Sequence, residues 1–350
     1  MRVSEFDFEL PDELVAQSPA PRGESRLLVL DRAGGSLEHT TVSALPRHTR
    51  QGDLLVINDT RVFAARLLGR RVPSGGAVEC LLLEGASQDG GHTYPALMHP
   101  GQKLKEGSRV RFEGEAGVLM GEVLARHFHG RRTIRLWSET GAPVPALIDA
   151  LGHIPLPPYI RRADQPSDRE RYQTVYARAR GSVAAPTAGL HFTPELLEAL
   201  ARSGVERASL TLHVGYGTFK PVRTESVEEH VVDPEWYEIP PATAGALDRA
   251  RRDGRRIIAV GTTTTRALED AAVRGFGQVA SGDALASVFI YPGFSFQVIS
   301  GLLTNFHLPR SSLLMLICAF AGRERVLAAY RDAVAKRYRF YSYGDAMLIV

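Results

Sequence analysis

Three histidines lie in segments that are rich in glycine and small polar residues, within the C-terminal two-thirds of the chain. They are His191 in GSVAAPTAGLHFT, His213 in TLHVGYGTF and His307 in LLTNFHLPR. An imidazole changes its charge near neutral pH, so a histidine on a loop can accept or donate a proton during a reaction. We therefore expect an enzyme whose active site is built on these loops.

The segment around His191 precedes a predicted helix, with Thr193 as its N-cap, Pro194 in its first turn and Gly204 as its stop. Gly189 would let a ligand approach the backbone, and the first N–H groups of the helix could bind an anion. A helix-entry loop with a hydrogen-bonded histidine explains the same residues equally well.

The segment around His213 reads as a strand that runs into a loop with Gly215 and Gly217. Catalytic residues of α/β proteins commonly lie where strands end and loops begin. A bent hairpin would also explain the two glycines. The third glycine and the following helix of a dinucleotide-binding motif are missing, which excludes that kind of site here.

Two further segments contain polar residues that packing of a hydrophobic core does not require. In AVGTTTTRALED, four threonines open a predicted helix; they favour a hydroxyl-rich N-cap, and the alternative is an anion site. In 300–320, Thr304, Asn305, His307 and Arg310 interrupt an apolar run. Burying Asn or His unpaired costs about 1–3 kcal/mol each, so these groups are expected to have protein partners or a ligand.

The histidines do not form a metal-binding pattern. The pair His127 and His129 alternates on a basic strand, without a third ligand nearby in the sequence. A zinc site there is not expected, because structural and catalytic zinc need at least three protein ligands.

Composition is that of an ordinary globular protein. Of the 350 residues, 44% are hydrophobic and 23% charged, which suits two domains with their own cores. The net charge of +3 permits a nucleic-acid partner without requiring one. Cys80 and Cys318, the two cysteines, both lie in apolar runs, which fits a reducing compartment.

Nothing in the sequence predicts export or a membrane. Acidic residues stand near the N-terminus where a signal peptide needs an apolar core, and the longest apolar stretch, 313–321, is about half a bilayer span. We therefore expect a soluble cytoplasmic protein. No coiled-coil pattern suggests an oligomer, which favours a monomer.

The order of the predicted elements indicates two architectures. Short apolar strands such as RLLVL and DLLVI begin the chain, and strands alternate with helices after about residue 146, where ASVFIYPG and SFQVISG are also interpreted as strands. Between them, short strands separated by glycine-rich turns indicate a small antiparallel β-barrel. We predict a large α/β domain formed by 1–62 and 150–350, with the barrel inserted at 63–149.

Taken together, these segments resemble one family, the bacterial S-adenosylmethionine:tRNA ribosyltransferase-isomerases of queuosine biosynthesis. The resemblance covers nearly the whole chain from residue 10. The matching stretches include GDLLVINDTRVFAARL, GHIPLPPYIRR, GSVAAPTAGLHFT, LTLHVGYGTFKPV, VGTTTTRALE, LLTNFHLPRSSLLML and YRFYSYGDAMLI. The chain departs from the family pattern at Asp233, Ser300 and the pair Ala286 and Ser287, and no essential role is assigned to these positions.

The resemblance implies a transfer in which S-adenosylmethionine gives up its ribosyl part. The acceptor would be the aminomethyl group of 7-aminomethyl-7-deazaguanine at the wobble position of a tRNA. The products would be epoxyqueuosine in tRNA, adenine and methionine. No metal or further cofactor is implied. The fold implied is a large, distorted barrel-like α/β domain with an inserted small β-barrel.

This chemistry needs a base beside the cationic sulfur and an acid for the departing adenine, and groups with pKa values near 7 do such work best. The residues expected to be catalytic are His213, His307, Glu235 and Asp345, and of these His213 and His307 are expected to act in proton transfer. The residues expected to bind substrate are Asp59, Arg61, Thr187, Gly189, His191, Gly215, Tyr216, Gly217, Phe219, Thr263, Asn305 and Tyr343.

The tRNA needs basic side chains for its phosphates and aromatic rings for an unpaired base. The residues expected to bind it are Arg66, Arg161, Arg162, Arg169, Arg171 and Tyr172. A second basic group lies at 126–135. An exposed surface on which these arginines pair with Asp164, Asp168 and Glu170 is the alternative for 161–171.

Two other functional classes remain open on the residues alone. One is a histidine-dependent hydrolase, which lacks the support of a G-x-S-x-G or metal motif. The other is a non-catalytic RNA-binding protein built around the barrel, which would not need polar residues inside apolar runs. Release of adenine only when S-adenosylmethionine and the deazaguanine-bearing tRNA are both present would separate the three.

Overall fold

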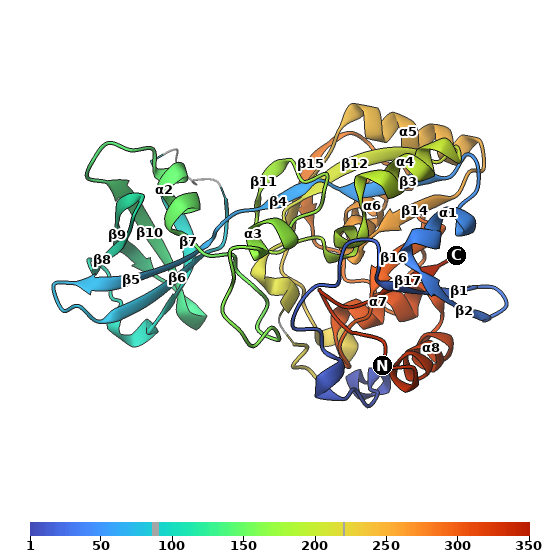
Figure 1. Ribbon diagram of the computed structural model, residues 1–350, viewed down its shortest axis with the longest axis horizontal. Helices are drawn as coiled ribbons and strands as arrows, with labels where there is room; N and C mark the ends of the chain where they lie inside the picture. Colours follow the sequence, from blue (N-terminus) through green and yellow to red (C-terminus); the bar gives the residue numbers. More distant parts are fainter. Residues whose placement is uncertain (86–90, 220) are drawn as a thin grey trace.

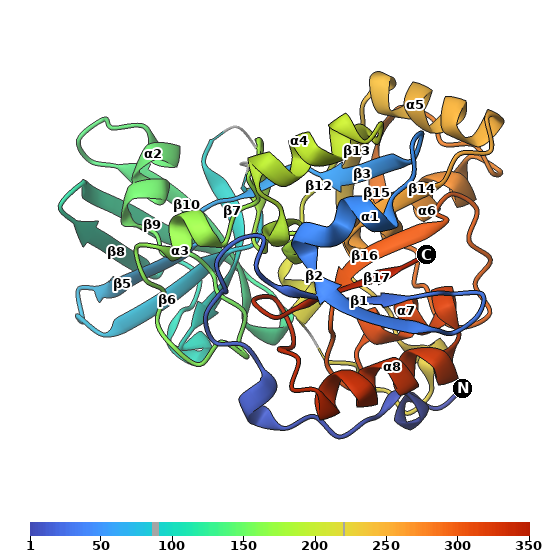
Figure 2. The ribbon, with the colours of Figure 1, turned by 45° about the vertical axis from the view of Figure 1, so that its right-hand side comes forward.

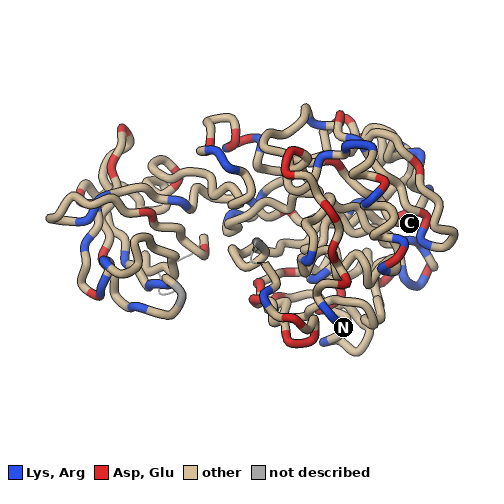
Figure 3. Tube along the Cα trace, turned by 90° about the horizontal axis from the view of Figure 1, so that it is seen from below, with Lys and Arg blue, Asp and Glu red and all other residues tan. Residues whose placement is uncertain are grey.

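The computed structural model describes residues 1–85, 91–219 and 221–350. Two units lie side by side, a nine-stranded sheet covered by helices and a closed barrel of six strands (Figure 1). The predicted combination of a large α/β unit with a small antiparallel barrel is therefore confirmed. Positions of both charge signs are distributed over both units (Figure 3).

The large sheet is mixed, and its four central strands run parallel. The order is β15 (Gly282–Ala286), β13 (Glu235–Ile239), β12 (Glu206–Leu212), β3 (Leu54–Asn58), β14 (Ile257–Val260), β16 (Gly301–Asn305), β17 (Ala346–Ile349), β1 (Arg26–Leu30) and β2 (Leu37–Thr41). Strands β12, β3, β14 and β16 are parallel, with Val56 opposite both Ala208 and Ala259. The sheet has edges at β15 and β2, so the barrel-like form expected for this domain is an open sheet.

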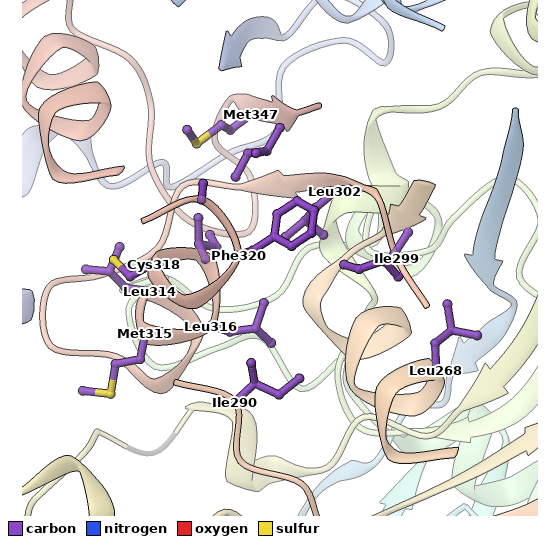
Figure 4. Packing of buried hydrophobic residues seen from close by; sticks show 14 of the residues in the cluster. Leu268, Ile290, Ile299, Leu302, Leu314, Met315, Leu316, Cys318, Phe320 and Met347 are labelled. Carbon is purple, nitrogen blue, oxygen red and sulfur yellow. The ribbon is translucent and has the colours of Figure 1, made fainter. Parts of the chain in front are cut away.

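Helices cover both faces of the sheet, as buried strands of this kind require. On one face lie α1 (Leu45–His48) and α4 (Pro194–Arg202), which pack through residues such as Leu45 and Leu196. On the other lie α5 (Pro241–Arg252), α6 (Thr262–Arg274), α7 (Ser312–Ala321) and α8 (Arg323–Ala335). Figure 2 shows α4 and α8 on opposite sides of the strands, and Figure 4 shows Ile290 beside Leu316 of α7 within the larger core.

Every strand of the small barrel is antiparallel to its neighbours. They are β5 (Arg66–Val72), β6 (Ala77–Leu82), β7 (Thr93–His99), β8 (Arg109–Gly114), β9 (Gly117–Arg126) and β10 (Arg131–Ser138), in the closed order β10-β7-β6-β5-β8-β9. Gly121 leaves room inside the barrel, because a Cβ there would lie 2.8 Å from Ile134 and 2.9 Å from Val110. Helix α2 (Val144–Leu151) packs on the barrel core through Leu147 and Ile148.

Short elements connect the two units. Strands β4 (Thr60–Val62) and β11 (Ala179–Ser182) pair in parallel, and α3 (Asp168–Arg171) follows the barrel. The short 3-10 helices are η1 (Val3–Phe6), η2 (Asp12–Leu14), η3 (Val42–Ala44), η4 (Gly101–Lys103), η5 (Phe128–Gly130), η6 (Thr187–His191), η7 (Tyr216–Phe219) and η8 (Val227–Glu229). The domain division at residues 63 and 149 remains a prediction; helix α2 extends to Leu151.

The prediction of strands in ASVFIYPG and SFQVISG is wrong, because this segment is a loop held by two carboxylates of helix α6. Glu269 accepts backbone hydrogen bonds from Gln297, Val298 and Ile299 at 2.8, 3.0 and 3.0 Å. Asp270 accepts two more, from residues 287 and 288. Backbone N–H groups that bond to carboxylates are not available for a strand ladder, and only Gly282–Ala286 forms the strand β15.

Candidate active site

A cavity lies at the carboxyl edge of the parallel strands, where β14 and β16 end. We call it the central cavity; its empty volume is about 530 Å³. Ligand sites of α/β sheets form at this edge. Its lining residues are Tyr159, Ala184, Ala185, Pro186, Thr187, Ala188, Val214, Thr218, Gly261, Thr262, Thr263, Thr304, Asn305, His307, Leu313, Tyr341 and Ser342.

Asn305 ends strand β16 and lines this cavity. Its Nδ2 donates to Nε2 of His191 at 3.1 Å and to the Tyr341 carbonyl oxygen at 3.2 Å. Its carbonyl oxygen Oδ1 is buried and has no partner within the described part of the chain. A buried acceptor of this kind is costly unless a ligand donates to it. His191 itself does not line the cavity, and burial lowers its pKa to about 4.

The threonines of helix α6 divide into two pairs. Thr264 and Thr265 donate back to the carbonyls of Val260 and Gly261, at 2.6 and 3.1 Å. Thr262 and Thr263 face the cavity, and the buried hydroxyl of Thr263 has no partner among the described residues. The favoured interpretation of a threonine N-cap is therefore wrong: the N-cap is Gly261, and no side chain caps the helix. Its first N–H groups lie beside an unpaired hydroxyl, which suits an anionic ligand group.

His307 lies in the wall of the central cavity, as the apolar run with embedded polar residues suggested. Its Nε2 is 3.0 Å from the hydroxyl of Thr304, and its backbone N–H donates to the Tyr330 hydroxyl. Burial lowers the pKa of His307 to about 3. The imidazole is therefore neutral at physiological pH, so it can accept a proton or hydrogen-bond a ligand but does not carry a proton to donate as imidazolium.

Two tyrosines form an aromatic wall. Tyr159 and Tyr341 both line the cavity, edge to face at 73°, and the Tyr159 hydroxyl bonds to Ser342. Tyr343, which the sequence favoured, points elsewhere and donates to Asp168 at 2.8 Å. The backbone at Tyr341 is left-handed, with φ of 73°.

A second cavity of about 540 Å³, the adjoining cavity, shares Thr218 and Leu313 with the first. Its other lining residues are Gly217, His230, Val231, Val232, Asp233, Glu235, Arg266, Phe289, Ile290, Ser312 and Leu316. Glu235 accepts from Arg266 at 2.5 Å through Oε2, and from Gly215 N–H and the Thr218 hydroxyl at 2.8 and 2.9 Å through Oε1. This buried ion pair holds the loop that separates the two cavities.

His213 lies outside the lining of both cavities. Its Nδ1 is 2.8 Å from the Thr60 hydroxyl, and its ring stacks on Trp236 with centroids 5.0 Å apart. Burial lowers the pKa of His213, against a raising effect of nearby Asp59. Asp59 in turn accepts from Thr211 and Arg178 at 2.6 and 2.9 Å, so it also has protein partners.

Asp345 has a structural environment that does not support the expected catalytic role. Its oxygens accept from the backbone N–H of Arg26 and Arg339 at 3.0 and 2.8 Å, and from the Arg26 guanidinium at 3.0 Å. It lines neither cavity. These hydrogen bonds tie the start of the C-terminal strand to β1.

The glycines and other loop residues that were expected to bind substrate lie at different places in the structure. Thr187 lines the central cavity and Gly217 the adjoining one. At Gly189 the side chain of Tyr176 occupies the space of a Cβ, which would lie 2.2 Å from the Tyr176 hydroxyl. Arg61 is exposed on β4, and Tyr216 is half-buried on η7. The side chain of Phe219 lies outside the described part of the structure.

Most of the basic residues expected to bind tRNA are engaged in protein contacts. Arg162 pairs with Asp168 at 2.7 Å, Arg169 donates to the carbonyls at the end of α2, and Arg171 donates to the Ala20 carbonyl. Arg66 pairs with Glu79 at 2.8 Å, and the exposed Arg161 pairs with Asp12 at 3.2 Å. Tyr172 is fully buried, so it cannot stack on a base. Of the pairs in the alternative, Arg162 with Asp168 is formed, whereas Asp164 pairs with His153.

Several cavity residues were missed in the sequence, among them Tyr159, Thr218, Tyr341 and Ser342. Tyr159 and Tyr341 lie within the matching stretches GHIPLPPYIRR and YRFYSYGDAMLI, which was the available signal. At the departures from the family pattern, Ser300 accepts from Ile257 N–H, Ala286 is a β15 residue opposite Glu235, and Ser287 bonds to Asp270.

Within residues 1–85, 91–219 and 221–350, no three His, Cys, Asp or Glu side chains come together as a metal-binding group. Over the same residues, no helix has the length and apolar character to cross a bilayer.

Comparison with known proteins gives one consistent result. The family model described as "Queuosine biosynthesis protein" matches residues 3–349. The S-adenosylmethionine:tRNA ribosyltransferase-isomerase of Anaeromyxobacter sp. (strain Fw109-5) is 53% identical over 100% of this chain and 99% of the relative. That of Moorella thermoacetica is 50% identical over 100% of both. The crystal structure of the S-adenosylmethionine tRNA ribosyltransferase from Thermotoga maritima covers 99% of this chain and 100% of its own, with 37% identity and a TM-score of 0.55.

Proposed function

Because the chain belongs to the S-adenosylmethionine:tRNA ribosyltransferase-isomerase family of queuosine biosynthesis, we propose that its central cavity binds S-adenosylmethionine, the ribosyl donor. The enzyme transfers the ribosyl group of S-adenosylmethionine to tRNA. In our proposal the acceptor is 7-aminomethyl-7-deazaguanine at the wobble position, and transfer with isomerisation gives epoxyqueuosine, adenine and methionine.

The observation that carries this assignment is the pair of unpartnered buried polar atoms in the cavity wall, Thr263 Oγ1 and Asn305 Oδ1. Within the described lining, no Lys, Arg, Asp or Glu side chain is present. A site without cations can accept a sulfonium, and the Tyr159 and Tyr341 rings can stabilise its positive charge. The N-terminus of α6 suits the methionyl carboxylate, and Asn305 Oδ1 can accept from a ligand N–H or O–H.

The residues differ in the proton-transfer roles that they support. We propose His307 as the proton acceptor or hydrogen-bond partner, since it lies in the cavity wall and is neutral. A cationic sulfur beside it would disfavour protonation further. His213 and Glu235 contact the elements around the cavities, so we assign them to positioning. Glu235 is one side of a buried ion pair that fixes the loop between the cavities.

Release of adenine tests the function directly. Labelled S-adenosylmethionine is mixed with the protein and with tRNA that carries, or lacks, the aminomethyl-deazaguanine base. We expect release only with the modified tRNA. Release without tRNA, or none with either tRNA, would contradict the assignment.

Three further properties are proposals with their own tests. We propose that the reaction needs no metal, which unchanged turnover after dialysis against a chelator would support. We propose a cytoplasmic protein, in keeping with a tRNA substrate and the two free, buried cysteines Cys80 and Cys318. We propose a monomer, which light scattering on the purified protein would test.

A further inference from the structure

We propose that the adjoining cavity and the tip of the β9–β10 hairpin of the barrel together bind the acceptor, an unpaired purine-like base in an RNA loop. The inference rests on the proposed function, because it takes the central cavity as the donor site. It assigns the second cavity and a surface of the barrel to the RNA.

The position of the adjoining cavity is the first argument. Thr218 and Leu313 line both cavities, so the two cavities are neighbours with these side chains between them. A group transfer requires donor and acceptor atoms to lie in contact before reaction. The space next to the donor cavity is therefore the place for the acceptor base.

The chemistry of the lining is the second argument. The rings of His230 and Phe289 lie edge to face with centroids 5.2 Å apart, and Ile290 and Leu316 add apolar surface. The Glu235 carboxylate lies in the same lining, with three of its roughly four acceptor positions occupied by Gly215, Thr218 and Arg266. Aromatic and apolar walls with one remaining carboxylate acceptor suit a flat heterocycle that carries N–H donors.

The barrel reaches this cavity through one ion pair. Arg131, the first residue of β10, lies 3.5 Å from the carboxylate of Asp233, which lines the adjoining cavity. The start of β10 thus lies against a residue of the cavity lining, although the two segments are about a hundred residues apart. In the same strand, Arg132 is buried and donates to the carbonyls of Leu104 and Gly101, which holds the hairpin in place.

The hairpin tip presents the groups that an RNA loop requires. Phe128 is 88% exposed, and Arg126 and Arg131 on either side of it are exposed. An exposed phenylalanine contributes little to the core, but an unpaired base can stack on it, and the two guanidinium groups can contact phosphates.

Variants of the tip test the surface. Phe128→Ala and Arg131→Ala are compared with Phe276→Ala, a 99% exposed phenylalanine at the end of α6, and with Arg202→Ala on α4. Binding of an anticodon stem-loop carrying the aminomethyl-deazaguanine is measured at several salt concentrations. We expect Phe128→Ala to weaken binding about 5- to 100-fold, and Arg131→Ala to reduce the slope of log K against log salt by about 0.7. Both controls should match the parent protein. Binding within twofold of the parent for Phe128→Ala would overturn the proposal.

A variant inside the cavity tests the base site. His230→Ala should raise the KM for tRNA at least fivefold, while calorimetry with S-adenosylhomocysteine shows unchanged affinity for the donor cavity. An unchanged KM would exclude the adjoining cavity as the base site. If the parent protein releases no adenine at all, the proposed function fails; if it is active and Phe128→Ala and His230→Ala behave like it, only this inference fails.

Discussion

Asn305 Nδ2 donates to His191 Nε2 over 3.1 Å, and this bond joins the end of β16 to the loop before α4. The bond determines the direction of the amide, because the same Nδ2 also donates to the Tyr341 carbonyl. The carbonyl oxygen of Asn305 is then left for a ligand in the central cavity. His191 thus acts on the site through Asn305, from outside the cavity lining.

Thr263 and Thr264 are neighbours with opposite expected effects. Thr263→Val removes a hydroxyl without a partner in the described structure, so it should leave stability unchanged or slightly raised. It should weaken binding of S-adenosylhomocysteine by about 1 kcal/mol, or roughly fivefold. Thr264→Val removes a bond to the Val260 carbonyl and should cost about 1 kcal/mol of unfolding free energy with affinity intact. Calorimetry measures the affinity for S-adenosylhomocysteine, and urea unfolding measures the stability. An equal loss of affinity in the two variants would contradict the assignment of the Thr263 hydroxyl to the ligand site.

Acid should destabilise the protein through its buried histidines. The pKa of His307 is lowered to about 3 and that of His191 to about 4, against about 6.5 for an unfolded histidine. Between those values the unfolded chain binds more protons. The free energy of unfolding therefore falls as pH drops below about 6.5, by at most about 1.4 kcal/mol per pH unit for each histidine.

Urea unfolding between pH 4 and 7 measures this slope. His307→Gln should give a shallower dependence on pH than the parent protein, whereas His99→Gln, at an exposed barrel position, should retain the parent slope. A parent-like slope in His307→Gln would show that this imidazole is not kept neutral by burial.

Glu235→Gln should destabilise the fold because it leaves the buried guanidinium of Arg266 without its counter-charge. Breaking a buried ion pair from one side costs about 3–5 kcal/mol. The double variant Glu235→Gln with Arg266→Leu should lose less than the sum of the single variants. Asp248→Asn, which breaks an exposed pair with Arg252, should cost less than about 1 kcal/mol. If the losses of unfolding free energy in the two single variants simply add up in the double variant, Glu235 and Arg266 do not stabilise each other.

Substitution of Tyr341 should affect donor binding, whereas substitution of Tyr343 should affect stability. Tyr341→Ala removes part of the cavity wall and should weaken donor binding at least fivefold. Tyr343→Phe loses one hydrogen bond to Asp168, so it should cost about 1 kcal/mol or more of stability and leave donor affinity unchanged. Calorimetry and thermal melts separate the two outcomes, and a reversed pattern would place the ligand on the Tyr343 side.

Much of the fold could be predicted from local pattern. Thr193 is the N-cap of α4, with its hydroxyl accepting from Leu196 N–H, as expected from Thr-Pro before an apolar helix. The short strands between glycine turns do form a closed barrel. These features depend on residues that are close together in the chain, so they can be predicted from the sequence. The loop at 287–300 could not be predicted, because its backbone partners, Glu269 and Asp270, lie in a helix 17 to 30 residues away.

The sequence by itself determined the family, the two architectures and the segments that meet at the carboxyl edge of the sheet, since each depends on residue types and their order. Only the tertiary structure decided which side chains face the ligand. Tyr341 and Tyr343 are two residues apart in one motif, yet only Tyr341 lines the cavity, while Tyr343 donates to Asp168. His213 and Asp345 carry groups suited to catalysis, but their neighbours Thr60 and Arg26 engage them outside it. Side-chain direction and hydrogen-bond partners depend on contacts between distant segments, and these exist only after the chain has folded.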